Sequence, residues 1–85
     1  MPLFLIERQF AEKLEITPEG VEAIGGINEQ AGVQWLYSFL NADQTKTYCL
    51  YEARNPDDIR RAAEMAGIPA DKIVEVSKID PHSAK

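Results

Sequence analysis

The sequence predicts one α+β domain whose elements follow the order strand, helix, strand, strand, helix, strand. Three observations lead to this prediction. Four short segments are rich in β-branched, aromatic or other apolar residues. Two longer segments carry apolar residues at helical spacing, each between a proline and a glycine. A chain of 85 residues has room for a single domain, so residues 1–85 are expected to fold as one unit.

The first strand is expected over Leu3–Gln9, an apolar run without glycine or proline. A helix follows from Pro18, because Thr17 suits the N-cap and proline suits the first helical position. Gly32 should end this helix. The Gly25–Gly26 pair lies inside it, and because glycine is a poor helix former we expect a kink or a broken turn there.

Two further strands are expected over Val33–Leu40 and Lys46–Glu52, both rich in aromatic and β-branched residues. The residues between them, Asn41–Gln44, are typical of a turn. The two strands should therefore pair as an antiparallel hairpin.

The second helix has the clearest boundaries in the chain. Asn55 suits the N-cap, Pro56 the first helical position and Gly67 the stop. The last strand is expected over Ile73–Ile79, followed by a frayed tail over Asp80–Lys85. This order of elements is the split βαβ, or ferredoxin-like, pattern: a four-stranded antiparallel sheet with two helices on one face.

Both faces of the predicted sheet carry apolar side chains, although two helices can cover only one. In the first strand Leu3 and Leu5 alternate with Phe4 and Ile6. Strict alternation in the second strand places Val33, Trp35, Tyr37 and Phe39 on one face and Leu36 and Leu40 on the other. A sheet with one wet face should alternate apolar and polar residues, and a domain this small has a marginal core. We therefore expect a homodimer formed sheet to sheet, the alternative being a ligand cleft within a monomer.

The charge of the chain excludes some classes of partner. The net charge is -5, which argues against binding to nucleic acid or to anionic membrane. No apolar run approaches the roughly 20 residues of a membrane helix. The single cysteine cannot form an internal disulfide, so a cytoplasmic location is expected.

Glu7 and Glu75 are candidates for a carboxylate pair, because the first and last strands are neighbours in a ferredoxin-like sheet. If both side chains face the same way, the pair could serve acid–base chemistry or bind a metal. The alternative is that these residues form ion pairs with Arg8, Lys78 or a partner chain.

Four aromatic residues, Trp35, Tyr37, Tyr48 and Tyr51, could wall a small-molecule pocket, because they combine apolar bodies with polar tips. The alternative is that they form the sheet core and the dimer interface. Cys49 has no histidine near it in sequence, so we assign no catalytic residue and expect an inert buried thiol. Cys49 could also be a lone soft metal ligand in a site completed by carboxylates.

Several segments resemble a group of small ferredoxin-like proteins of unknown function, some of which bind nickel. The matching segments are Leu3–Arg8, Gln34–Leu40, Lys46–Tyr51, Gly67–Ala70, Glu75–Val76 and Ile79–Pro81. The resemblance implies a dimeric assembly of the α/β-barrel type and makes nickel the one candidate cofactor. Relatives commonly carry histidine where this chain has Tyr37, or in and just after the second helix, where it has Ala62, Ala63 and Ile68.

The leading hypothesis is a cytoplasmic, homodimeric binding protein for a metal ion or a small molecule held at the sheet face. The alternative is a dimeric α/β-barrel enzyme, an isomerase or cofactor-free oxygenase, with Glu7 or Glu75 as its acid–base group. A purely structural interaction module is a third possibility.

Overall fold

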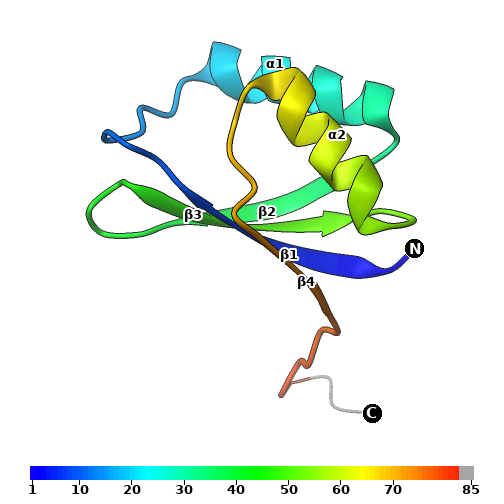
Figure 1. Ribbon diagram of the computed structural model, residues 1–85. Helices are drawn as coiled ribbons and strands as arrows, with labels where there is room; N and C mark the ends of the chain where they lie inside the picture. Colours follow the sequence, from blue (N-terminus) through cyan, green and yellow to red (C-terminus); the bar gives the residue numbers. More distant parts are fainter. Residues whose placement is uncertain (83–85) are drawn as a thin grey trace.

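The computed structural model describes residues 1–82 and confirms the predicted ferredoxin-like α+β fold. The elements are β1 (Leu3–Gln9), α1 (Pro18–Ala31), β2 (Gln34–Leu40), β3 (Lys46–Glu52), α2 (Pro56–Ala66) and β4 (Lys72–Val76). The strands form one sheet in the order β2-β3-β1-β4, and every neighbouring pair is antiparallel. Both helices lie on one side of this sheet, and the other side is open (Figure 1). We call these the covered face and the open face.

The two central strands, β1 and β3, alternate between the faces over their whole length. Phe4, Ile6 and Arg8 of β1 are buried against the helices, while the residues between them are only half-buried. β3 alternates in the same way. The buried core extends from these strands to both helices; its members are Phe4, Ile6, Ala31, Val33, Cys49, Tyr51, Ala53, Ile59 and Ala62.

The strict alternation expected along β2 is wrong, because a β-bulge interrupts it. The register shifts between Trp35, which pairs with Tyr51, and Tyr37, which pairs with Leu50. The extra residue, Leu36, has no partner across the ladder and moves every later side chain to the opposite face. Trp35 therefore lies on the covered face, whereas Tyr37 lies on the open face.

The kink expected at the Gly25–Gly26 pair is also wrong, since α1 runs without interruption through both glycines. A Cβ atom at either position would meet no other atom within 4 Å, so no close packing requires glycine there. Glycine lowers the stability of a helix without changing its geometry. The ends are as predicted: Thr17 Oγ1 accepts a hydrogen bond from the Gly20 amide at 3.1 Å, and Gly32 takes a left-handed φ of 76°.

The last strand is shorter than expected and ends at Val76. Beyond it, Ile79 is 89% exposed and pairs with no strand. The last three residues of the predicted tail, 83–85, lie outside the described residues. Within residues 1–82, neither helix is long and apolar enough to cross a membrane.

The boundaries of α2 are those predicted. Asn55 Oδ1 accepts a hydrogen bond from the Asp58 amide at 2.9 Å, as an N-cap should. The buried Asp58 carboxylate is paired with Arg54 and Arg61 at 3.3 and 3.4 Å. Gly67 ends the helix at a left-handed φ of 69°.

We predict that Asn55→Ala lowers the free energy of unfolding by about 1 kcal/mol, because the Asp58 amide loses its acceptor. Gly67→Val should cost at least as much, because a β-branched residue is strained at positive φ. Urea denaturation measures both. Gly26→Ala is the control and should raise stability by about 0.5–1 kcal/mol. Unchanged stability in both destabilising variants would contradict the assigned ends of α2.

Candidate functional site

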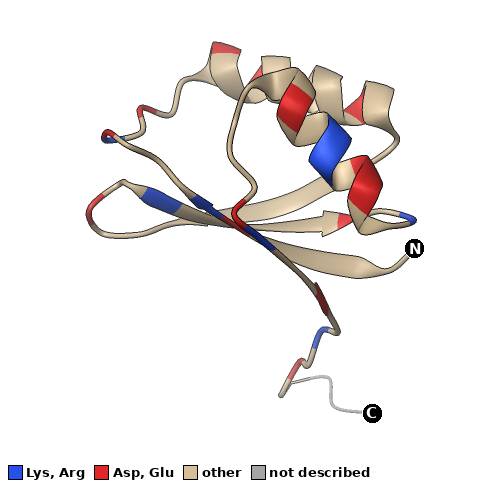
Figure 2. Ribbon diagram, in the orientation of Figure 1, with Lys and Arg blue, Asp and Glu red and all other residues tan. Residues whose placement is uncertain are grey.

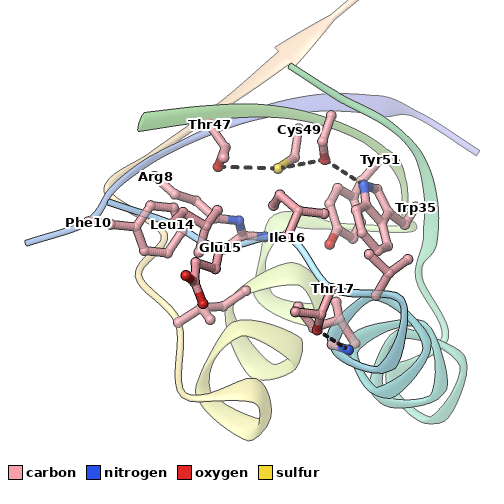
Figure 3. A pocket seen from close by; sticks show the side chains of 15 residues that line it. Arg8, Phe10, Leu14, Glu15, Ile16, Thr17, Trp35, Thr47, Cys49 and Tyr51 are labelled. Carbon is pink, nitrogen blue, oxygen red and sulfur yellow. Dashed lines mark hydrogen bonds between the residues drawn. The ribbon is translucent and has the colours of Figure 1, made fainter. Parts of the chain in front are cut away.

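A cavity of about 130 Å³ lies on the covered face, between the sheet, α1 and the segment that connects β1 to α1 (Figure 3). Its floor is formed by side chains of β1, β2 and β3, and the connecting segment closes one side. The lining residues are Arg8, Phe10, Leu14, Glu15, Ile16, Thr17, Gly20, Val21, Ile24, Trp35, Ser38, Thr47, Cys49, Tyr51 and Ile68. Most of these present apolar atoms, which makes the cavity suitable for an apolar ligand.

Two aromatic rings form one wall of the cavity. The Trp35 and Tyr51 rings are stacked, with their centroids 6.5 Å apart and their planes 11° from parallel. Behind them, Asn28 Nδ2 donates a hydrogen bond to the Tyr51 hydroxyl at 3.2 Å, which holds the phenol in place. Burial raises the pKa of Tyr51, although the nearby Arg8 charge opposes the shift, so the hydroxyl stays neutral near pH 7.

A chain of hydrogen bonds crosses the floor of the cavity (Figure 3). Trp35 Nε1 donates to Ser38 Oγ at 2.7 Å, and Ser38 Oγ donates to Cys49 Sγ at 3.0 Å. Cys49 Sγ in turn donates to Thr47 Oγ1 at 3.6 Å. The thiol of Cys49 is therefore buried, as expected, and hydrogen-bonded on both sides.

The donor set around Cys49 does not fit a nickel centre. Nickel(II) favours imidazole and thiolate ligands, whereas the neighbours of this thiol are the hydroxyls of Ser38 and Thr47. Among residues 1–82, no group of three or more histidine, cysteine, aspartate or glutamate side chains could hold a metal ion. The hypothesis of a metal ligand at Cys49, completed by carboxylates, finds no such carboxylates here.

Arg8 is the charged residue on the cavity floor, and the sequence analysis did not predict it as a site residue. Its side chain is 3% exposed and its guanidinium carbon lies 5.8 Å from the Tyr51 ring centroid. Nη1 donates a hydrogen bond of 2.6 Å to the Pro69 carbonyl oxygen. Its position in the sequence could have indicated this. Alternate residues of a strand share a face, so Arg8 points to the same inward side as Phe4 and Ile6.

The structure divides the other predicted site residues between the two faces. Trp35, Tyr51 and Cys49 line the cavity together. Tyr37 and Tyr48 lie on the open face, where Tyr48 pairs with Phe39 across the ladder. The four predicted aromatic residues therefore do not form one pocket.

The predicted carboxylate pair is not formed, because Glu7 and Glu75 lie on opposite faces of the sheet. In the β1–β4 ladder Glu7 pairs with Lys72. Glu75 pairs with Phe4, whose side chain points to the covered face. Glu7 instead forms an ion pair of 2.9 Å with Lys46, a partner that the sequence analysis did not name. This contact raises the pKa of Lys46.

The open face is apolar in its centre. The apolar residues that share this face across the ladders are Leu3, Leu5, Tyr37, Phe39, Tyr48, Leu50, Val74 and Val76, whereas Glu7, Glu52 and Lys72 lie nearer its ends. Tyr37 and Phe39 are each 62% exposed. The edge strand β2 carries no charged residue, as its uniform tan colour in Figure 2 shows. The predicted two-sided apolar sheet is therefore present.

Comparisons with known proteins agree with the fold and identify the family. No curated protein matches the chain. The crystal structure of SCO4226 from Streptomyces coelicolor A3(2) superposes with a TM-score of 0.75 and 22% sequence identity, covering 92% of this chain and 99% of that one. Residues 4–76 match the family described as "Nickel responsive protein SCO4226-like". This match covers most of the chain and all six elements of the sheet and helices, so the protein belongs to the SCO4226-like nickel responsive family.

Proposed function

We propose that this protein is a homodimeric binding protein that holds a small apolar molecule in the cavity of each subunit. The observation that carries the proposal is the cavity of about 130 Å³ against the core. The cavity opens to solvent beside the exposed residues Ile16 and Val21, so its apolar lining lies against water. Covering apolar surface is favourable by about 25 cal/mol per Å². A ligand that fills the space would gain this free energy.

An organic ligand accounts for the cavity better than nickel does. The family is described as nickel responsive, but the cavity lining offers one thiol and no imidazole. The other polar side-chain groups of the lining include several hydroxyls, the Glu15 carboxylate and the Arg8 guanidinium. A cation beside the site would oppose the binding of a second cation.

The enzyme alternative lacks its acid–base group at the cavity. Neither Glu7 nor Glu75 lines it, and Glu15, the one carboxylate of the lining, is exposed. A general acid or base acts from within hydrogen-bonding reach of its substrate. The geometry therefore favours binding over catalysis.

The dimer is proposed to form through the open face. Its apolar centre, with Tyr37 and Phe39 both well exposed, would be covered by the same surface of a second copy. We expect more than about 1,000 Å² of buried surface, the threshold for a stable assembly. Pairing of two sheets in this way produces the barrel-like assembly expected from the resemblance.

We further propose a cytoplasmic location. The chain contains one cysteine, Cys49, which is buried as a free thiol. Proteins of oxidising compartments commonly stabilise small domains with disulfides, which this chain cannot form internally.

The first prediction tests the cavity with benzyl alcohol, a neutral molecule of suitable size. Trp35 is the only tryptophan in the chain and lines the cavity, so its emission should change saturably on binding. Ile24→Phe fills the cavity from α1 and should abolish this response without loss of stability. Ile79→Phe makes the same substitution at a site outside the lining and should bind like the wild type. An equal response in Ile24→Phe would contradict the proposed site.

The second prediction concerns the dimer. Light scattering should show a dimer at micromolar concentration. Tyr37→Lys should raise the dimer dissociation constant at least about tenfold, because the variant buries an unpaired charge in an apolar contact. Ile79→Lys adds the same charge at an exposed residue outside the sheet and should leave the dimer intact. A monomeric wild type would refute the proposed assembly.

The third prediction concerns nickel. The resemblance implies histidine in relatives at the positions of Tyr37, Ala62, Ala63 and Ile68, so calorimetry should detect weak nickel binding or none. Any weak binding through the thiol should disappear in Cys49→Ser. Stoichiometric binding with sub-micromolar affinity would show that other ligands compensate for the missing histidines.

A further inference from the structure

We propose that the cavity selects a small organic anion, a carboxylate whose apolar body is about the size of one phenyl ring, and that Arg8 supplies the opposing charge. This inference rests on the proposed function, in which the cavity binds a ligand, and adds the chemical class of that ligand.

Arg8 carries a buried charge that forms no ion pair within residues 1–82. Arg8 is 3% exposed. Burial of an ion is costly unless a group of opposite charge compensates it, and arginine is always protonated. Yet the ion pairs of residues 1–82 all involve other cations: the N-terminus, Lys46, Arg54, Arg60 and Arg61. The Pro69 carbonyl and the Tyr51 ring compensate part of this charge, and an anion bound in the cavity would complete the compensation.

Arg8 has more hydrogen-bond donors than the protein around it uses. A guanidinium has five N–H donors, and in the described part of the chain Nη1 of Arg8 donates to the Pro69 carbonyl, while the guanidinium also interacts with the Tyr51 hydroxyl. No buried side-chain nitrogen or oxygen of residues 1–82 lacks a partner. Any guanidinium nitrogen without a partner therefore keeps some accessible surface, and Arg8 is one of the residues that line the cavity. Figure 3 shows the guanidinium extending into the space between the sheet and α1.

The rest of the cavity lining offers no buried charge that would oppose an anion. Glu15 is its only acidic residue; it is exposed and forms no ion pair with Arg8. Tyr51 is neutral and hydrogen-bonded to Asn28, and the Cys49 thiol lies in the hydrogen-bond chain of the floor. Arg8 therefore carries the one charge in the interior of the cavity. A carboxylate suits it, because two oxygens can accept two parallel N–H donors of a guanidinium.

The volume of the cavity suits a molecule built on one phenyl ring. A cavity of about 150 Å³ lined by apolar side chains accommodates benzene. The cavity here, at about 130 Å³, is close to that volume, and the stacked Trp35 and Tyr51 rings provide an apolar wall. Drug-sized ligands usually occupy several hundred Å³, so this cavity suits a smaller molecule.

The experiment compares benzoate with benzyl alcohol, which share the phenyl ring and differ in charge. Trp35 emission should show that the wild type binds benzoate at least about tenfold more tightly, as expected for charged hydrogen bonds. Arg8→Met should abolish this preference while benzyl alcohol still binds. Arg8→Lys keeps the charge and should keep a smaller preference. Arg60→Met, the same substitution on the exposed side of α2, is the matched control and should keep the full preference.

The outcomes distinguish this inference from the proposed function. Equal binding of both molecules to the wild type would overturn the selection of anions and leave the binding cavity standing. Binding of neither molecule would overturn both. A preference for benzoate that survives in Arg8→Met would show that another group supplies the charge. Should Arg8→Met fail to fold, NMR of the wild type decides: benzoate must shift the Arg8 Nε–H resonance, and an unshifted resonance would overturn the inference.

Discussion

The structure depends on one constraint: two helices can cover only one face of a four-stranded sheet whose strands are apolar on both. Helices of 14 and 11 residues pack on the covered face and leave the open face with large exposed side chains. The domain is too small to bury the second face within itself. In the proposed function, the covered face meets its helices and a ligand, and the open face meets a second subunit.

The β-bulge in β2 determines which side chains of this strand lie on the covered face and which lie on the open face. Without the extra residue at Leu36, Trp35 and Tyr37 would lie side by side on one face. With it, Trp35 stacks on Tyr51 in the cavity and Tyr37 lies among the apolar residues of the open face. Bulges commonly redirect side chains next to functional sites, and this one separates the proposed binding site from the proposed interface.

Local signals were sufficient to predict the elements of this fold. Asn55 and Gly67 act at the ends of α2 through backbone geometry that depends on near neighbours, so the sequence indicates them directly. The candidate site depends on long-range register, which local signals do not contain. The separation of Glu7 from Glu75 and the pairing of Glu7 with Lys46 both follow from strand pairing. The alternation of β1 could have predicted that Arg8 points inward. That no carboxylate among residues 1–82 pairs with it could be established only from the structure.

The central claim is that the two faces of one sheet have separate roles. Native mass spectrometry of the wild type and of Tyr37→Lys, each with benzoate, tests it most directly because it reports subunit number and bound mass together. The account predicts a wild-type dimer that carries up to one benzoate per subunit, and a Tyr37→Lys monomer that still carries one. A variant that loses benzoate together with its partner would place the ligand at the interface and contradict the account.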